Sequence, residues 1–318
     1  MSFDLYFQPR GREPSKQQFR AHFRRRPHYT LDESSATYHN KDTGVYFWFS
    51  LEGPSDPEEE NQAFRPPPWI IRAISALCGR RRISFGSEDD QRLIWASFGI
   101  NLGRPSFFGQ EAAIELQAFL GAFNPLVVDE SDTIRQQYSH DDFIRDWEAS
   151  NRLGVRALRA LDDAKNVPVY PAEKLRRIWM WNYERADFQN EVADRFFVPK
   201  IAFYRDSDGT KAAATWAYDV PVCLPQVDIV ILTPPSAGLE SLSKSDLRVV
   251  PWSRIAPRLR NLPAEQRALP YWEITIDDAE VLAGVLLKES DDGTRLDSMS
   301  DDEVLDEELV RSAFESGD

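Results

Sequence analysis

The first part of the chain alternates strand patterns with helix patterns. Residues 2–8 carry apolar side chains at every second position, which is the period of a half-buried strand. Residues 16–26 follow Pro14 and Ser15 and repeat their apolar positions every four residues, so they predict a helix. Further strands are expected at 29–31, 36–39 and 45–51, the last two as a hairpin around an Asn40–Gly44 turn.

A second strand–helix–strand pattern follows between residues 91 and 128. A strand at 91–102 precedes a helix to about 123, with Ser106 as its expected N-cap, and a strand at 126–128 ends the unit. This unit loosely repeats the order of residues 2–31, which suggests a duplicated, ferredoxin-like βαβ unit. Chance similarity of two amphipathic units is the alternative.

The remainder of the chain is helical first and β-rich afterwards. Two long helical patterns cover 139–161 and 171–196, and strands are expected at 199–204, 212–218, 227–232, 248–250 and 272–276. The overall prediction is an α+β protein: N-terminal βαβ-type units, a helical segment, and a mostly antiparallel β/α C-terminal part. The predicted domains are 1–135 and 136–288, followed by an acidic tail at 289–318.

The tail differs from the rest of the chain in its charge. The chain has 42% hydrophobic residues, enough for a packed core, and a net charge of -14. Twelve of the last thirty residues are Asp or Glu, opposed only by Arg295 and Arg311. The tail is either a solvated, disordered segment or an acidic amphipathic helix, because Leu305, Leu309 and Ala313 have helical spacing and such a helix docks on basic surfaces.

Neither the cysteines nor the apolar runs indicate export or membrane insertion. Cys78 and Cys223 lie far apart outside any CxxC motif, so both are expected to be buried free thiols. The N-terminus lacks the pattern of a signal peptide, and no apolar run is long enough for a transmembrane helix. A cytoplasmic location is therefore expected.

The motifs of common enzyme classes are missing from the sequence. It contains no nucleotide-binding glycine loop, zinc motif or nucleophile elbow, so we expect no catalytic residues, no cofactor and no metal. His140 precedes Asp141 and Asp142 behind Ser139, which is better interpreted as a helix start than as a metal site. His28 and His39, near Asp32, leave an unrecognised catalytic site open as an alternative.

Two arginine runs form a candidate basic patch: Arg24, Arg25, Arg26, Arg80, Arg81 and Arg82. The first run ends the helix predicted at 16–26 and the second follows a helical pattern at 69–78, and cations at the end of a helix complement its dipole. Phosphate binding is the functional alternative, with Arg10, Arg12 and Arg20 added to the first run. The negative net charge makes nucleic acid the less favoured partner. Docking of the acidic tail on this patch is the third option.

Two further groups are candidates for binding a protein partner. One is an acidic loop with Asp56, Glu58, Glu59 and Glu60. The other is an aromatic helix in which Trp179 and Trp181 are two residues apart, so they point in nearly opposite directions and one of them is expected at the surface. Exposed Trp beside Arg is typical of a binding hot spot.

The opening residues Ser2, Phe3, Asp4, Leu5, Tyr6 and Phe7 resemble the start of uncharacterised bacterial cytosolic proteins. Some of those look like immunity proteins of polymorphic toxin systems. The resemblance covers only the first strand and transfers no functional residue. It implies a non-catalytic protein that binds and neutralises a toxin.

Three functions are consistent with the sequence. The favoured one is a non-catalytic protein that binds a basic protein partner, such as a toxin domain, through an anionic surface. The alternatives are an enzyme with an unrecognised site and a nucleic-acid-associated protein that uses the arginine clusters. No membrane partner is expected.

Overall fold

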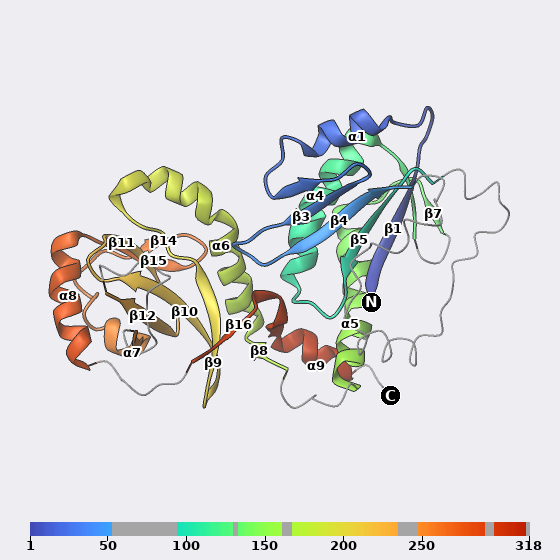
Figure 1. Ribbon diagram of the computed structural model, residues 1–318. Coiled ribbons are helices and arrows are strands. Elements are labelled where there is room, and N and C mark those ends of the chain that lie inside the picture. The colour runs from blue at the N-terminus through green and yellow to red at the C-terminus, as the bar shows by residue number, and fades with distance from the viewer. Residues whose placement is uncertain (53–93, 130–132, 161–166, 235–246, 290–295, 316–318) are drawn as a thin grey trace. The chain divides into compact units, whose positions relative to one another are not determined.

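The computed structural model (Figure 1) describes residues 1–52, 94–129, 133–160, 167–234, 247–289 and 296–315. Within these ranges the chain mixes helices with mostly antiparallel sheets, which confirms the predicted α+β class. It forms two compact units: unit 1 contains residues 1–167 and 309–318, and unit 2 contains residues 168–308. The division therefore falls later than the predicted boundary at 135, and the last helix groups with the N-terminal unit.

Unit 1 is built on a seven-stranded sheet in the order β2-β3-β4-β5-β1-β6-β7. Every neighbouring pair of strands is antiparallel. The strands are β1 (Ser2–Gln8), β2 (Tyr29–Leu31), β3 (Ser35–His39), β4 (Tyr46–Leu51), β5 (Ala96–Asn101), β6 (Leu126–Val128) and β7 (Ile134–Arg135). The predicted hairpin is present as β3 and β4.

Helices cover one face of this sheet (Figure 1). They are α1 (Lys16–Phe23), α4 (Phe107–Phe123) and α5 (His140–Ala160). Aromatic rings fill the space between helices and strands. The ring centroids of Phe7 and Phe119 are 4.8 Å apart, and those of Phe49 and Phe23 are 5.0 Å apart. The alternation of β1 thus places its phenylalanines in the core, as its sequence predicts.

The two predicted strand–helix–strand units have different places in the sheet. β5 and β6 flank β1 on either side, so β5-α4-β6 is a split βαβ arrangement. β1 and β2, by contrast, are separated by three other strands. α1 begins with the expected Ser15 cap, where Gln18 completes a capping box. α4 begins directly after Ser106, as predicted, but the Ser106 side chain makes no cap hydrogen bond and its backbone is helical.

Unit 2 contains a five-stranded sheet in the order β13-β12-β10-β9-β16 and two smaller sheets, β11-β15-β14 and β17-β8. The strands are β8 (Val169–Tyr170), β9 (Ile201–Asp206), β10 (Gly209–Ala217), β11 (Val222–Pro225), β12 (Ile229–Thr233), β13 (Arg248–Pro251), β14 (Glu265–Gln266), β15 (Pro270–Ile274), β16 (Asp297–Met299) and β17 (Leu305–Asp306). Its helices are α6 (Ala172–Val192), α7 (Trp252–Ile255) and α8 (Ile276–Glu289).

The described part of the acidic tail is structured, which contradicts the disordered alternative. β16 pairs with β9, and Asp301 forms a 2.7 Å ion pair with Lys200. β17 then pairs with β8, and the chain ends in the amphipathic helix α9 (Glu307–Glu315). α9 buries Leu309 and Ala313, and the backbone oxygen of Ala313 accepts a hydrogen bond from Arg156 on α5. Arg156 belongs to neither arginine run, so this described contact of the tail is not the predicted docking on the arginine patch.

Candidate interaction surfaces

Several predicted site residues lie outside the described residues. They are the acidic loop with Asp56, Glu58, Glu59 and Glu60, the second arginine run Arg80, Arg81 and Arg82, and Cys78. Cys223 is buried in β11, and burial raises the pKa of its thiol to about 12. It is a structural thiol with no access to solvent.

The two tryptophans of α6 point to different surroundings, as their spacing predicts. Trp181 is 2% exposed, and its Nε1 atom donates a hydrogen bond to the backbone oxygen of Pro199 at 2.9 Å. Trp179 is half-buried and its ring lies 5.7 Å from that of Tyr183. Trp181 therefore belongs to the core and cannot contact a partner directly. Of the two residues, only Trp179 is placed to do so.

The first arginine run is divided between the fold and the surface. Arg26 forms a two-pronged ion pair with Glu115 on α4, with Nε–Oε2 and Nη2–Oε1 distances of 2.7 and 3.1 Å. Arg24 and Arg25 are exposed. Arg26 thus ties the end of α1 to α4, and only its two neighbours are available for a ligand.

Two buried glutamates on α4 form an internal cluster with polar residues of neighbouring elements. Glu111 is fully buried, and its Oε1 atom accepts hydrogen bonds from three neutral donors: Tyr38 Oη at 2.7 Å, Asn40 Nδ2 at 2.9 Å and Thr43 Oγ1 at 3.1 Å. One turn later, Glu115 holds Arg26. Buried carboxylates persist only when such partners compensate the lost hydration. These contacts anchor the β3–β4 hairpin and α1 to α4.

One histidine, His22, lies close enough to this cluster for the charges of Arg26 and Glu115 to act on its pKa. The amide of His39 donates a backbone hydrogen bond to the His28 oxygen at 2.8 Å, but both side chains are exposed. His22 packs among phenylalanine rings, where burial and then the charge of Arg26 lower its pKa. No group of three or more His, Cys, Asp or Glu in the described ranges is placed to hold a metal ion.

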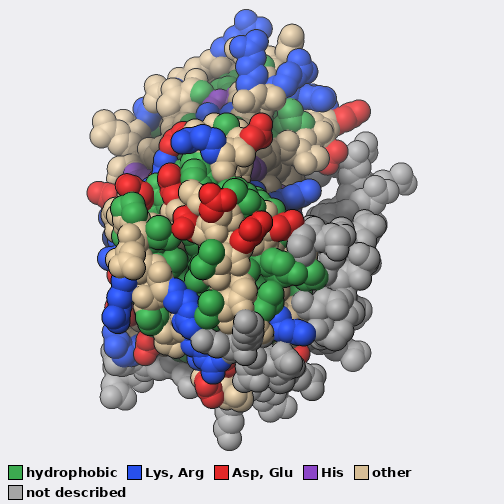
Figure 2. Space-filling model, turned by 90° about the vertical axis from the view of Figure 1, so that its left-hand side faces the viewer, with side chains coloured by type: hydrophobic (Ala, Val, Ile, Leu, Met, Phe, Trp, Pro, Cys, Tyr) green, Lys and Arg blue, Asp and Glu red, His purple; other side chains and the backbone are tan. Residues whose placement is uncertain are grey.

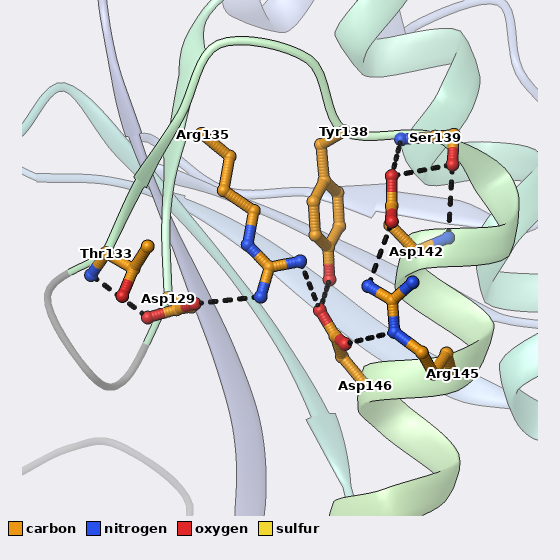
Figure 3. Close-up of polar contacts among 8 residues, drawn as sticks. All are labelled: Asp129, Thr133, Arg135, Tyr138, Ser139, Asp142, Arg145 and Asp146. Atoms are coloured by element: carbon orange, nitrogen blue, oxygen red, sulfur yellow. Dashed lines mark hydrogen bonds and ion pairs between the residues drawn. The ribbon is translucent and has the colours of Figure 1, made fainter.

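A polar network joins β6, β7 and the start of α5 (Figure 3). Arg135 bridges Asp129 and Asp146, with N–O distances of 3.1 and 2.7 Å, and the Tyr138 hydroxyl donates to Asp146 at 3.2 Å. Each of these carboxylates thus has a cation beside it. The network holds the segment before α5 in place, and its charged groups bind one another rather than a substrate.

The predicted helix start at Ser139 is confirmed within this network. The Ser139 hydroxyl accepts from the Asp142 amide at 3.1 Å, and the Asp142 carboxylate accepts from the Ser139 amide at 3.0 Å. Arg145 adds a 2.9 Å ion pair. The hydrogen bonds from Ser139, followed by that from Arg145, lower the pKa of Asp142 to about 2.

The sequence of α8 places acidic residues and exposed apolar residues on the same helix. Its first turn is fixed by Thr275, whose hydroxyl donates to Asp278 at 2.8 Å and accepts from the Asp278 amide. Four acidic residues lie between positions 273 and 280, without any Lys or Arg: Glu273, Asp277, Asp278 and Glu280. The inner side of the helix buries Ala279, Leu282, Ala283 and Leu286.

The outer side of α8 is apolar at its centre. Val281 is 73% exposed, Val285 is 38% exposed, and both follow Asp277 at intervals of four residues, so they form one stripe. Ile276, 40% exposed, lies at the start of the helix. Figure 2 shows hydrophobic side chains beneath a group of acidic ones on the side of unit 2 that carries α8. We call this surface, made of Glu273, Ile276, Asp277, Glu280, Val281 and Val285, the α8 face.

The sequence contains signals for both features that the predictions missed. Glu111 and Glu115 are the two charged residues of a mostly apolar helix and are spaced by four, which marks buried carboxylates that need partners. In α8, apolar residues occur on all sides of the helix, which is more than one buried side requires.

Comparisons with family models, curated proteins and solved structures found no match for this chain. In the described part of the chain, every helix is too short or too polar to cross a membrane.

Proposed function

We propose that this protein is a non-catalytic binding protein that holds a basic protein partner on the α8 face. One observation carries the proposal: Val281 is 73% exposed at the centre of a surface whose edge is formed by acidic residues. Protein interfaces combine an apolar centre, which supplies most of the binding energy, with a polar rim. The α8 face has both parts.

Charge decides which kind of partner fits. Residues 273–308 contain fourteen Asp or Glu and two Lys or Arg, a net charge of -12 out of -14 for the whole chain. An anionic surface accelerates the approach of a cationic partner and repels an acidic one. We therefore expect Lys or Arg around the apolar contact of the partner.

Gly284 leaves room for a partner to approach α8 closely. It lies next to Val285 on the outer side of the helix, and a side chain at this position would meet nothing within 4 Å in the described structure. A glycine inside a helix costs about 1 kcal/mol relative to alanine. Since packing within the chain does not require it, a partner backbone close to the helix supplies a reason for a bare position.

We propose that the biological role of this binding is to neutralise a toxin. The support is chemical: toxins that act on nucleic acids need a basic surface, and an acidic binding protein can cover it. The internal carboxylates of unit 1 support the non-catalytic part of the proposal, because Glu111, Glu115 and Asp146 hold parts of the fold together.

Site-specific crosslinking tests the proposal. A photo-crosslinking residue replaces Val281 in one variant and Leu153 in another, and the proteins are irradiated in the producing cells. Leu153 is the matched control, because it is also an exposed apolar residue (58%) but lies on α5 of unit 1. We expect one basic protein at position 281 and none at 153, and adding Val285→Arg should abolish the product. Equal products at both positions, or an acidic partner at 281, would contradict the proposal.

A further inference from the structure

The helix α1 carries a row of cations, most of which form no ion pair among the described residues. Lys16, Arg20 and Arg24 follow one another at intervals of four residues, so they lie along one side of the helix about 6 Å apart. Like charges at this spacing destabilise a helix by about 0.2–0.5 kcal/mol per pair. We call these three residues, together with Arg12 and Arg25, the α1 row.

Acidic partners for this row are scarce. Lys16 forms an exposed 3.3 Å ion pair with Glu33. Arg12, Arg20, Arg24 and Arg25 make no ion pair among the described residues, and the Nε atom of Arg20 is buried without a hydrogen-bond partner. Glu13 is the only acidic residue between positions 5 and 31. The row is therefore a local excess of positive charge.

The negative charge of the whole chain does not cancel this excess. Residues 1–31 contain seven Lys or Arg and two Asp or Glu, a net charge of +5. The 52 acidic residues are divided equally between the two units, but unit 2 has fewer cations and carries -10 of the net charge of -14. At 0.1 M salt, charges on a protein surface are largely screened beyond about 10 Å. Figure 2 shows Lys and Arg side chains gathered at its upper end, the end at which α1 lies in Figure 1.

The row lacks what a protein partner would need. None of the exposed large hydrophobic residues of the described structure belongs to α1 or to its flanking residues, whereas α8 carries three. A surface of regularly spaced guanidinium groups without an apolar centre suits a ligand with regularly spaced anionic charges, such as a phosphodiester chain.

A polar pocket lies beside the row. Its volume is about 440 Å³ and its lining residues are Arg10, Asn124, Gln136 and Gln137. Arg10 lies only two residues before Arg12, so the pocket adjoins the Arg12 end of the row. Amide side chains offer both a donor and an acceptor, which is the combination that recognises the edge of a nucleobase. An unstacked base can enter such a pocket, but a base within a duplex cannot.

We infer that unit 1 binds single-stranded nucleic acid, with phosphates on the α1 row and a base in the pocket of Gln136 and Gln137. This inference is independent of the protein partner proposed for the α8 face, because it concerns a different surface and a ligand of opposite charge.

Fluorescence anisotropy of a labelled single-stranded 12-mer tests the inference with the full chain. The variant Arg20→Gln/Arg24→Gln/Arg25→Gln is compared with Arg176→Gln/Arg177→Gln/Arg260→Gln, which removes the same charge from unit 2. Loss of three phosphate contacts should lower the slope of log K against log salt by about 2 in the first variant and leave it unchanged in the second. Equal urea midpoints of the variants and the parent chain control for folding.

Three results would overturn the inference. They are failure of the parent chain to bind the 12-mer at 50 mM salt, equal losses in the two variants, and stronger competition by a poly-glutamate peptide than by unlabelled 12-mer. The pocket is tested separately with Gln137→Ala, which should reduce the preference for single strand over duplex without changing the salt slope. Equal binding of both forms by the parent chain would remove the pocket from the site.

Discussion

The helices α1 and α8 are both amphipathic surface helices, but their outer sides differ in two respects. α1 is cationic and carries no exposed large hydrophobic residue, whereas α8 is acidic and has Val281 and Val285 at its centre. Charge alone attracts any ligand of opposite sign and is weakened by salt. An apolar centre adds binding energy that depends on shape and resists salt.

The comparison shows that the net charge of a chain does not predict its partners. The value of -14 argues against nucleic acid when it is assigned to the whole chain, yet the first 31 residues carry +5. Each helix therefore has to be judged by the charges and apolar groups of its own surface.

The largest expected change in stability distinguishes the structural arginine of the first run from its two surface neighbours. Arg26→Met leaves the nearly buried Glu115 without its cation and should lower the free energy of unfolding by about 2–3 kcal/mol, below the value for a fully buried pair because Arg26 is partly exposed. Arg24→Met and Arg25→Met should change it by less than about 0.5 kcal/mol. Urea denaturation measures all three. Similar losses would show that the α1 row is part of the fold.

Glycine substitutions test whether the open position on α8 serves a partner. Gly284→Ala should raise the free energy of unfolding by about 0.5–1 kcal/mol, since the position is open and helical, and should weaken crosslinking at position 281. Gly109→Ala is the opposite case, because its new side chain would lie 2.4 Å from the buried ring of Trp147. It should cost about 1–3 kcal/mol. Unchanged crosslinking in Gly284→Ala would mean that no partner approaches this position closely.

The smallest expected change in the free energy of unfolding comes from a charge at the start of α5, and it depends on pH. Asp142→Asn removes a capping-box acceptor and an ion pair and should cost about 1 kcal/mol at pH 7. Because folding lowers the pKa of Asp142 from 3.8 to about 2, its stabilising contribution is complete above pH 4 and is lost as the pH falls toward 2. Asp141→Asn, in the same helical turn, is the control and should have little effect. Denaturation curves from pH 7 to pH 2.5 distinguish the two, and a pH-independent difference would contradict this cause.

Local patterns predicted the elements of the fold better than their arrangement. The alternation in residues 2–8, the 36–51 hairpin and the Ser139 helix start are all present, because each depends on contacts between residues close in sequence. The tail was predicted less well. β16 and β17 form by pairing with strands about 95 and 136 residues earlier in the chain, which no local pattern reveals.

The sequence predicted the candidate surfaces only in part. The opposite directions of Trp179 and Trp181 followed from helix geometry, and so did the position of the first arginine run at the end of a helix. The division of that run did not, because the partner of Arg26 is Glu115, 89 residues away. The α8 face was missed because exposure depends on which side of a helix the rest of the unit covers.

Amide hydrogen exchange of the full chain, with and without the basic protein recovered by crosslinking, shows whether that protein binds at α8. We expect slower exchange of the amides of residues 276–286 in the complex and unchanged exchange across residues 16–25. Slower exchange confined to residues 16–25, with α8 unaffected, would contradict the assignment of the partner to the acidic, apolar-centred helix.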